Sequence, residues 1–72
     1  MTYTIVLEDG PDGGWGGLVP DLPGLLLLGD SREEIIAEAP GAILDYLDAM
    51  RDSGHPVPHP GRYVVQVEVP AA

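Results

Sequence analysis

The sequence predicts an α+β domain, a two-layer sandwich in which a small β-sheet is covered on one face by one helix. Segments near both ends alternate between apolar and polar side chains, which is typical of strands. Between them, apolar residues recur every three or four positions, which is typical of an amphipathic helix. Short runs of glycine, proline and aspartate separate these segments. We therefore expect residues 1–72 to form a single domain with the element order β-β-β-α-β.

The first strand is expected over residues 2–8. Its side chains alternate, and three apolar ones point to the same side of the strand: Tyr3, Ile5 and Leu7. Residues 9–14 follow, and their glycine, aspartate and proline content is typical of a hairpin loop. The first two strands are therefore expected to be antiparallel neighbours.

The second strand is expected over residues 15–20, and it is a weak one. Gly16 and Gly17 have no side chain to pack, which indicates a bulge or a close approach of another part of the backbone. We expect Trp15 to cover this thin part of the sheet.

The third strand, Leu25 to Leu28, is apolar on both faces, whereas an antiparallel strand with one solvated face should alternate. The helix can cover one face. The other face then needs a second subunit or a partner protein. The alternative is that the outer leucines are partly exposed, or lie under the loop of residues 9–14.

The helix is expected to begin after Ser31, which can form a capping box with Glu34, and to end near Ser53. Pro40 and Gly41 interrupt its pattern. A proline inside a helix costs about 3 kcal/mol, because it removes a hydrogen bond and clashes with the preceding turn. We expect one kinked helix rather than two helices.

The chain then continues through a proline-rich connection, residues 55–61, into a fourth strand over residues 62–69. This strand alternates again, with Tyr63 and three valines on one side. If the first three strands form a meander, the helix returns the chain parallel to the first strand. A right-handed crossover then predicts the sheet order 3-2-1-4.

Composition excludes several classes of function. The formal net charge is −9, with twelve acidic and three basic residues, so direct binding to nucleic acid is not expected. The charge favours a basic protein partner, or it serves only solubility. There is no cysteine for a disulfide framework or a thiolate zinc site. No apolar run approaches the roughly 20 residues of a membrane span, so we expect a cytoplasmic protein without membrane contact.

No residues in the sequence make a convincing catalytic or metal site. His55 and His59 are four residues apart, but the prolines around them exclude a helix that would present both on one face. The glycine-rich loop lacks the lysine and the serine or threonine of a phosphate-binding loop. Three acids at expected strand ends could approach one another as a magnesium site: Glu8, Asp21 and Asp30. With twelve acids in the chain, such proximity is expected by chance.

Several motifs follow one another in a specific order and spacing. They are Pro20 to Gly24, Gly29 to Glu34, Ile43 to Leu47 and Asp52 to Pro58, with Gly13, Gly14 and Trp15 before them. Together they resemble the HicB-like antitoxin family over nearly the whole chain. The resemblance implies a reduced ribonuclease H-like fold with the β-β-β-α-β order. Many members continue into a DNA-binding domain, for which these residues provide no segment.

The resemblance implies a protein that inhibits by binding. Its partner would be a small, basic HicA-type toxin, an mRNA interferase whose catalytic histidine belongs to the toxin. We therefore expect no enzymatic activity and no cofactor or metal in this chain. The contact is expected on the acidic loops and the helix start, with one aromatic residue: Asp9, Asp12, Trp15, Asp21, Glu33 and Glu34.

Two other functions stay open. One is a stand-alone homo-oligomeric interaction module without a cognate toxin, and the other is a residual metal-dependent nuclease of the ribonuclease H-like type. A fold does not by itself confer that activity. The small size and the two apolar faces of the third strand predict a homodimer or a higher homo-oligomer.

Overall fold

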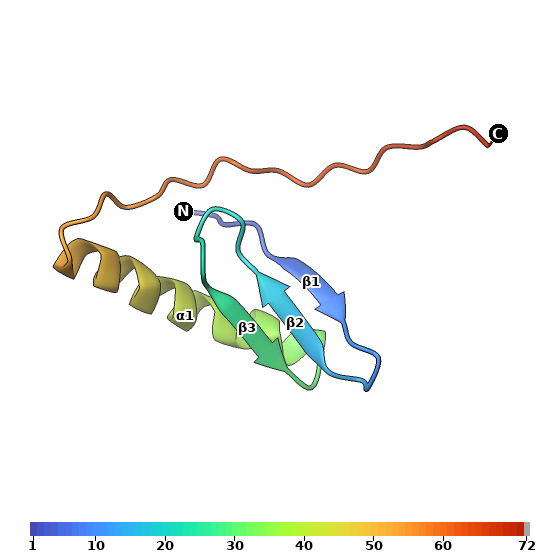
Figure 1. Ribbon diagram of the computed structural model, residues 1–72, viewed down its shortest axis with the longest axis horizontal. Coiled ribbons are helices and arrows are strands. Elements are labelled where there is room, and N and C mark those ends of the chain that lie inside the picture. Colours follow the sequence, from blue (N-terminus) through green and yellow to red (C-terminus); the bar gives the residue numbers. More distant parts are fainter. Residues whose placement is uncertain (72) are drawn as a thin grey trace.

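The computed structural model describes residues 1–71. Its elements are β1 (Val6–Asp9), β2 (Trp15–Leu18), β3 (Leu26–Gly29) and α1 (Arg32–Asp52). Both strand pairs are antiparallel, and β2 lies between β1 and β3. Figure 1 shows α1 behind the sheet, covering one face. The α+β class and the meander of the first three strands are therefore confirmed.

The first strand begins later than expected. Val6 is its first paired residue and lies opposite Leu18, the last residue of β2. After Val19 the chain turns at Pro20, which has no N–H to donate to a ladder. Pairing with β2 therefore stops at Val6, although Tyr3 and Ile5 still pack against the core from the preceding segment.

The inner face of the sheet approaches the helix closely at Gly17. Gly17 pairs with Leu7 on one side and with Leu27 on the other. A Cβ atom at this position would lie 3.0 Å from Cγ2 of Ile35, so a side chain here would force the Ile35 side chain to shift. The sequence predicts a bulge or a close approach of backbone at the paired glycines, whereas the atoms nearest to Gly17 belong to side chains.

The core consists of two clusters of buried apolar side chains between the sheet and α1. They are Val19, Leu22 and Leu47, and Leu27, Ile35 and Ala39. Leu22 is fully buried although it lies in the turn between β2 and β3. The same turn is fastened to the helix, because the Tyr46 hydroxyl donates to the Pro23 carbonyl over 2.8 Å.

Both ends of the helix follow the sequence signals. Oγ of Ser31 accepts a hydrogen bond from the Glu34 N–H over 3.2 Å. At the other end Gly54 has a φ of 77°, and the His55 N–H donates to the Met50 carbonyl over 2.9 Å. Pro40 lies inside one continuous helix, as expected rather than two helices. The kink at Pro40 stays a prediction.

The fourth strand is the main difference from the expected fold. Within residues 1–71 the sheet has three strands in the order β1-β2-β3, so the order 3-2-1-4 is not present. Residues 62–69, hereafter the C-terminal segment, are exposed and carry no strand pairing. Figure 1 shows this part of the chain crossing near the N-terminus and running away from the sheet. The alternating pattern is present, but no strand among residues 1–71 pairs with it.

Candidate functional site

The outer face of the sheet, on the side opposite α1, carries a row of apolar side chains. Val6 pairs with Leu18, and Leu18 pairs with Leu26, so these three lie side by side across the sheet. Leu28 lies on the same face one row further along β3. All four are exposed, from 44% for Val6 to 68% for Leu28. We call these four residues the outer apolar row.

A shallow hollow lies beside this row because the centre of β2 has no side chain. Gly16 pairs with Glu8 on β1 and with Leu28 on β3. A Cβ atom on Gly16 would be 3.9 Å from Cδ2 of Leu28, so the position has room for a partner's side chain. The hollow is lined by the outer apolar row and, at the hairpin end, by Glu8, Asp9 and Asp12. An apolar surface bordered by acids is suited to a basic protein partner.

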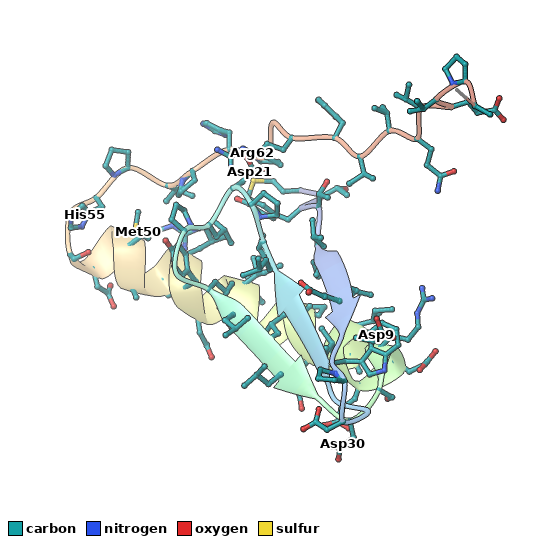
Figure 2. All side chains as sticks on the ribbon, turned by 45° about the vertical axis from the view of Figure 1, so that its right-hand side comes forward. Asp9, Asp21, Asp30, Met50, His55 and Arg62 are labelled. Atoms are coloured by element: carbon teal, nitrogen blue, oxygen red, sulfur yellow. The ribbon has the colours of Figure 1, made fainter. Side chains whose placement is uncertain are left out.

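Acidic residues gather at one end of the domain. Asp9 pairs with Trp15, which pairs in turn with Gly29 at the end of β3. The β1–β2 loop and the turn into α1 therefore share this end, and Figure 2 shows Asp9 and Asp30 both at this end of the sheet. Four acids of this end were predicted as partner-binding residues, and all are exposed: Asp9, Asp12, Glu33 and Glu34. Arg32 is the basic residue of the same turn.

The sequence predicts Trp15 both as a cover for the thin part of the sheet and as the aromatic residue of the partner contact. The Trp15 side chain is half-buried and packs against the cluster of Leu27, Ile35 and Ala39 on the inner side of the sheet. It therefore covers the thin part of the sheet, as the sequence predicts. It also borders the hollow of the outer face. Trp15 therefore packs mainly as a core residue.

Asp21 lies at the opposite end from the other predicted binding residues. It belongs to the turn between β2 and β3, and only 9% of its side chain is exposed. One carboxylate oxygen accepts a hydrogen bond from the Gly61 N–H over 3.1 Å. The other is 3.6 Å from Nε of Arg62, whose guanidinium also donates to the Pro20 carbonyl. Figure 2 shows Asp21 beside Arg62, far from Asp9 and Asp30. Asp21 thus fastens the chain near the start of the C-terminal segment.

A second apolar surface was not recognised from the sequence. It is a groove between α1 and the segment that precedes β1, and we call it the helix groove. Its lining is Met1, Thr2, Tyr3, Ile5, Ile36, Ala39, Pro40, Ile43, Leu44 and Leu47. Ile36 and Leu44 are the exposed members on α1, at 51% and 59%. Their spacing of eight residues was a signal for a second apolar side of the helix.

The structure brings together no set of residues suited to metal chemistry among those it describes. Within residues 1–71 there is no group of three histidine, cysteine, aspartate or glutamate side chains placed to hold an ion. Asp21 and Asp30 lie at opposite ends of β3, so the acids considered for magnesium do not converge. Nδ1 of His55 is 2.8 Å from the Ser53 hydroxyl at the end of the helix. Within the same range, α1 is too polar to span a membrane.

Comparison with known proteins adds independent information. Residues 3–70 match the family model described as the HicB_like antitoxin of a bacterial toxin-antitoxin system. The chain is also similar to Antitoxin HicB 2 of Photorhabdus laumondii subsp. laumondii, with 34% identity over 73 residues. That alignment covers all of this chain and 52% of the relative, so the chain spans about half the length of the curated protein that it matches.

Proposed function

We propose that this chain, which belongs to the HicB-like antitoxin family, is an antitoxin that binds a small basic HicA-type mRNA interferase and neutralises it by covering the toxin's active site. The observation that carries the proposal is the exposed acidic end next to the outer apolar row. The role is one of binding, in the cytoplasm where messenger RNA is found. No residue of this chain is assigned a catalytic role.

Charge supports the choice of a basic partner. A protein that cleaves RNA needs basic residues near its active site to neutralise phosphates. The four exposed acids Asp9, Asp12, Glu33 and Glu34 offer such a surface the opposite charge. Complementary charge accelerates encounter and fixes the register of a complex. Acidic side chains placed in the toxin's RNA-binding cleft would also compete directly with RNA phosphates.

The outer apolar row supplies the apolar centre of the interface, which charged residues cannot provide. Interfaces have an apolar centre that excludes water and a polar rim. Val6, Leu18, Leu26 and Leu28 form an exposed apolar area, and the acids of the hairpin lie at its edge. We infer that the toxin covers this row and contacts the acidic rim. Trp15 would support the floor of the contact, and Asp21 would take no direct part because its carboxylate is already bonded.

The proposal is tested by charge reversal against a matched control. The test variant is Asp9→Lys, Asp12→Lys and Glu33→Lys together. The control carries three reversals on exposed positions of α1 away from that end: Asp45→Lys, Asp48→Lys and Asp52→Lys. Binding to a basic toxin encoded beside this chain is measured by titration calorimetry at several salt concentrations.

We expect the test variant to bind at least about 10-fold more weakly and to lose most of the salt dependence. The control should stay within about 3-fold of the unmodified chain, because it has the same net charge but an intact acidic end. If both variants lost the same affinity, the effect of the acids would come from net charge alone, and the assigned binding surface would be rejected. Failure of any basic toxin to bind the unmodified chain would reject the antitoxin function itself.

A further inference from the structure

The helix groove has the position of a missing strand. β1 pairs with β2 on one side, and within residues 1–71 no strand pairs with its other side. The groove lies between α1 and the segment that leads directly into β1, residues 1–5. Ile36 and Leu44 are exposed apolar side chains of α1 in its lining. A free strand edge next to an exposed helix face is typically covered in a folded protein.

The C-terminal segment has the properties of the strand that would cover it. Its side chains alternate, so that Tyr63, Val65, Val67 and Val69 lie on one side of an extended chain. These four are between 77% and 86% exposed. Valine and tyrosine are among the residues most enriched in strands. This is an apolar strand face that its own chain leaves in solvent.

The chain just before this free stretch is held firmly. The Tyr3 hydroxyl donates to the Pro58 carbonyl over 2.7 Å, and the Thr4 hydroxyl donates to the Arg62 carbonyl over 2.9 Å. Asp21 accepts from the Gly61 N–H in the same region. The three prolines between His55 and Gly61 stiffen this connection. The direction in which the C-terminal segment leaves the domain is therefore set before Tyr63.

That direction leads away from the chain's own groove. Figure 1 shows the C-terminal segment running past the N-terminus and beyond the sheet. All of its residues are exposed. Seven residues from Tyr63 to Val69 reach about 23 Å in an extended conformation. This length is enough to pair along the whole of a four-residue strand on a neighbouring molecule.

We propose that the C-terminal segment of one chain binds in the helix groove of a second copy, as a fourth strand on the free edge of β1, and that the exchange is reciprocal. A two-fold axis then gives each subunit one donated strand and one received strand. The donated valines would cover Ile36, Ile43 and Leu44. Each sheet would gain the strand beside β1 that the sequence predicts, but from its partner.

The chemistry of the groove favours a second copy over a basic partner. All side chains that line it are uncharged, and Met1 adds the α-amino group of the N-terminus, whereas the acidic end and the hollow of the outer face carry carboxylates. Glu68 is the charged residue within the strand from Tyr63 to Val69, and it alternates to the side away from the valines. Two chains of charge −9 can therefore associate here without placing a carboxylate in the contact. The outer apolar row stays free for another protein.

The first test measures molar mass by light scattering during gel filtration. We expect the unmodified chain to elute at twice the chain mass of 7.6 kDa. Val65→Asp with Val67→Asp should shift the protein to the monomer with unchanged helical circular dichroism, because both residues are 77% exposed in their own domain. The control is Val64→Asp, which lies on the opposite side of the same segment and should leave the dimer intact. The proposal would be overturned if the unmodified chain stayed monomeric even at 100-fold the concentration of the assay. It would also be overturned if the variant with Val65→Asp and Val67→Asp still formed a dimer.

The second test identifies which chain supplies the strand. The sequence has no cysteine, so Leu44→Cys and Val67→Cys together create a single engineered pair. Under mild oxidation we expect a disulfide-linked band at twice the chain mass, because each segment lies in its partner's groove. A cross-link within one chain, seen as a faster-migrating band at the single-chain mass, would show that the segment folds back onto its own domain and would overturn the exchange. Both tests are made without the toxin, so that their outcome is separate from that of toxin binding.

Discussion

The first strand region, residues 2–8, and the C-terminal segment carry the same alternating pattern, but only the first buries its apolar side. In the first, Tyr3, Ile5 and Leu7 pack against the core. In the second, Tyr63 and the alternating valines lie in solvent, and Tyr63 and Val69 are each 86% exposed. The comparison teaches that alternation indicates which side of a segment is suited to burial. It does not say which surface will bury it, because any apolar surface with a free strand edge can do so.

The largest expected difference is in the free energy of unfolding that is lost when one apolar side chain is shortened, either in the core that buries the first strand region or in the C-terminal segment. Ile35 is fully buried under the sheet, so Ile35→Ala should lower the free energy of unfolding by about 2–5 kcal/mol. In a domain of this size such a loss is a large share of the total free energy of unfolding. Val64→Ala in the C-terminal segment should change it by less than about 0.5 kcal/mol. Urea titrations followed by circular dichroism measure both, and equal losses would contradict the division into a packed body and a solvated segment.

A smaller effect is expected from adding one methyl group to the middle strand. Gly17→Ala places a Cβ atom 3.0 Å from Cγ2 of Ile35, and the resulting shift of the Ile35 side chain should cost about 1–3 kcal/mol. Gly16→Ala places the same atom on the outer face, where the nearest atoms are 3.9 Å away. That control should cost less than 0.5 kcal/mol, because alanine there meets no clash and glycine is unfavourable in strands. If both variants were equally stable, the inner face would be less tightly packed than the structure indicates.

The smallest effect concerns the contacts that hold the chain before the C-terminal segment. Asp21→Asn removes the ion pair with Arg62 and weakens the bond from the Gly61 N–H, so the global loss should stay below about 1 kcal/mol. The sharper readout is amide exchange at Gly61, which we expect to become at least about 5-fold faster. The matched control is Asp48→Asn, which breaks the exposed pair with Arg51 and should leave the Gly61 amide unchanged. If amide exchange at Gly61 were unchanged in Asp21→Asn, Asp21 would not be the residue that holds this part of the chain in place.

Much of the fold could be predicted because its signals are local. The Ser31 cap, the left-handed Gly54 and the hairpin between the first two strands each depend on a few neighbouring residues. The candidate site was less predictable. Leu25 to Leu28 indicated an uncovered apolar face, and Leu26 and Leu28 are indeed exposed on it. Asp21 was grouped with the other acids but lies beside Arg62 at the other end of the domain, and charge and turn position do not reveal a partner so far along the chain.

The sequence by itself determined the order and type of the first four elements, the side of each strand that is apolar, and the acidic character of the surface. These follow from periodicity, caps and composition, which act over a few residues or over the whole chain. Only the tertiary structure decided that Trp15 packs inward and that Asp21 binds Arg62. It also decided that, within residues 1–71, the edge of β1 opposite β2 has no strand beside it. Each of these depends on contacts between segments that are far apart in the sequence. For the C-terminal segment, the path of the proline-rich connection after α1 determines which surface it can reach.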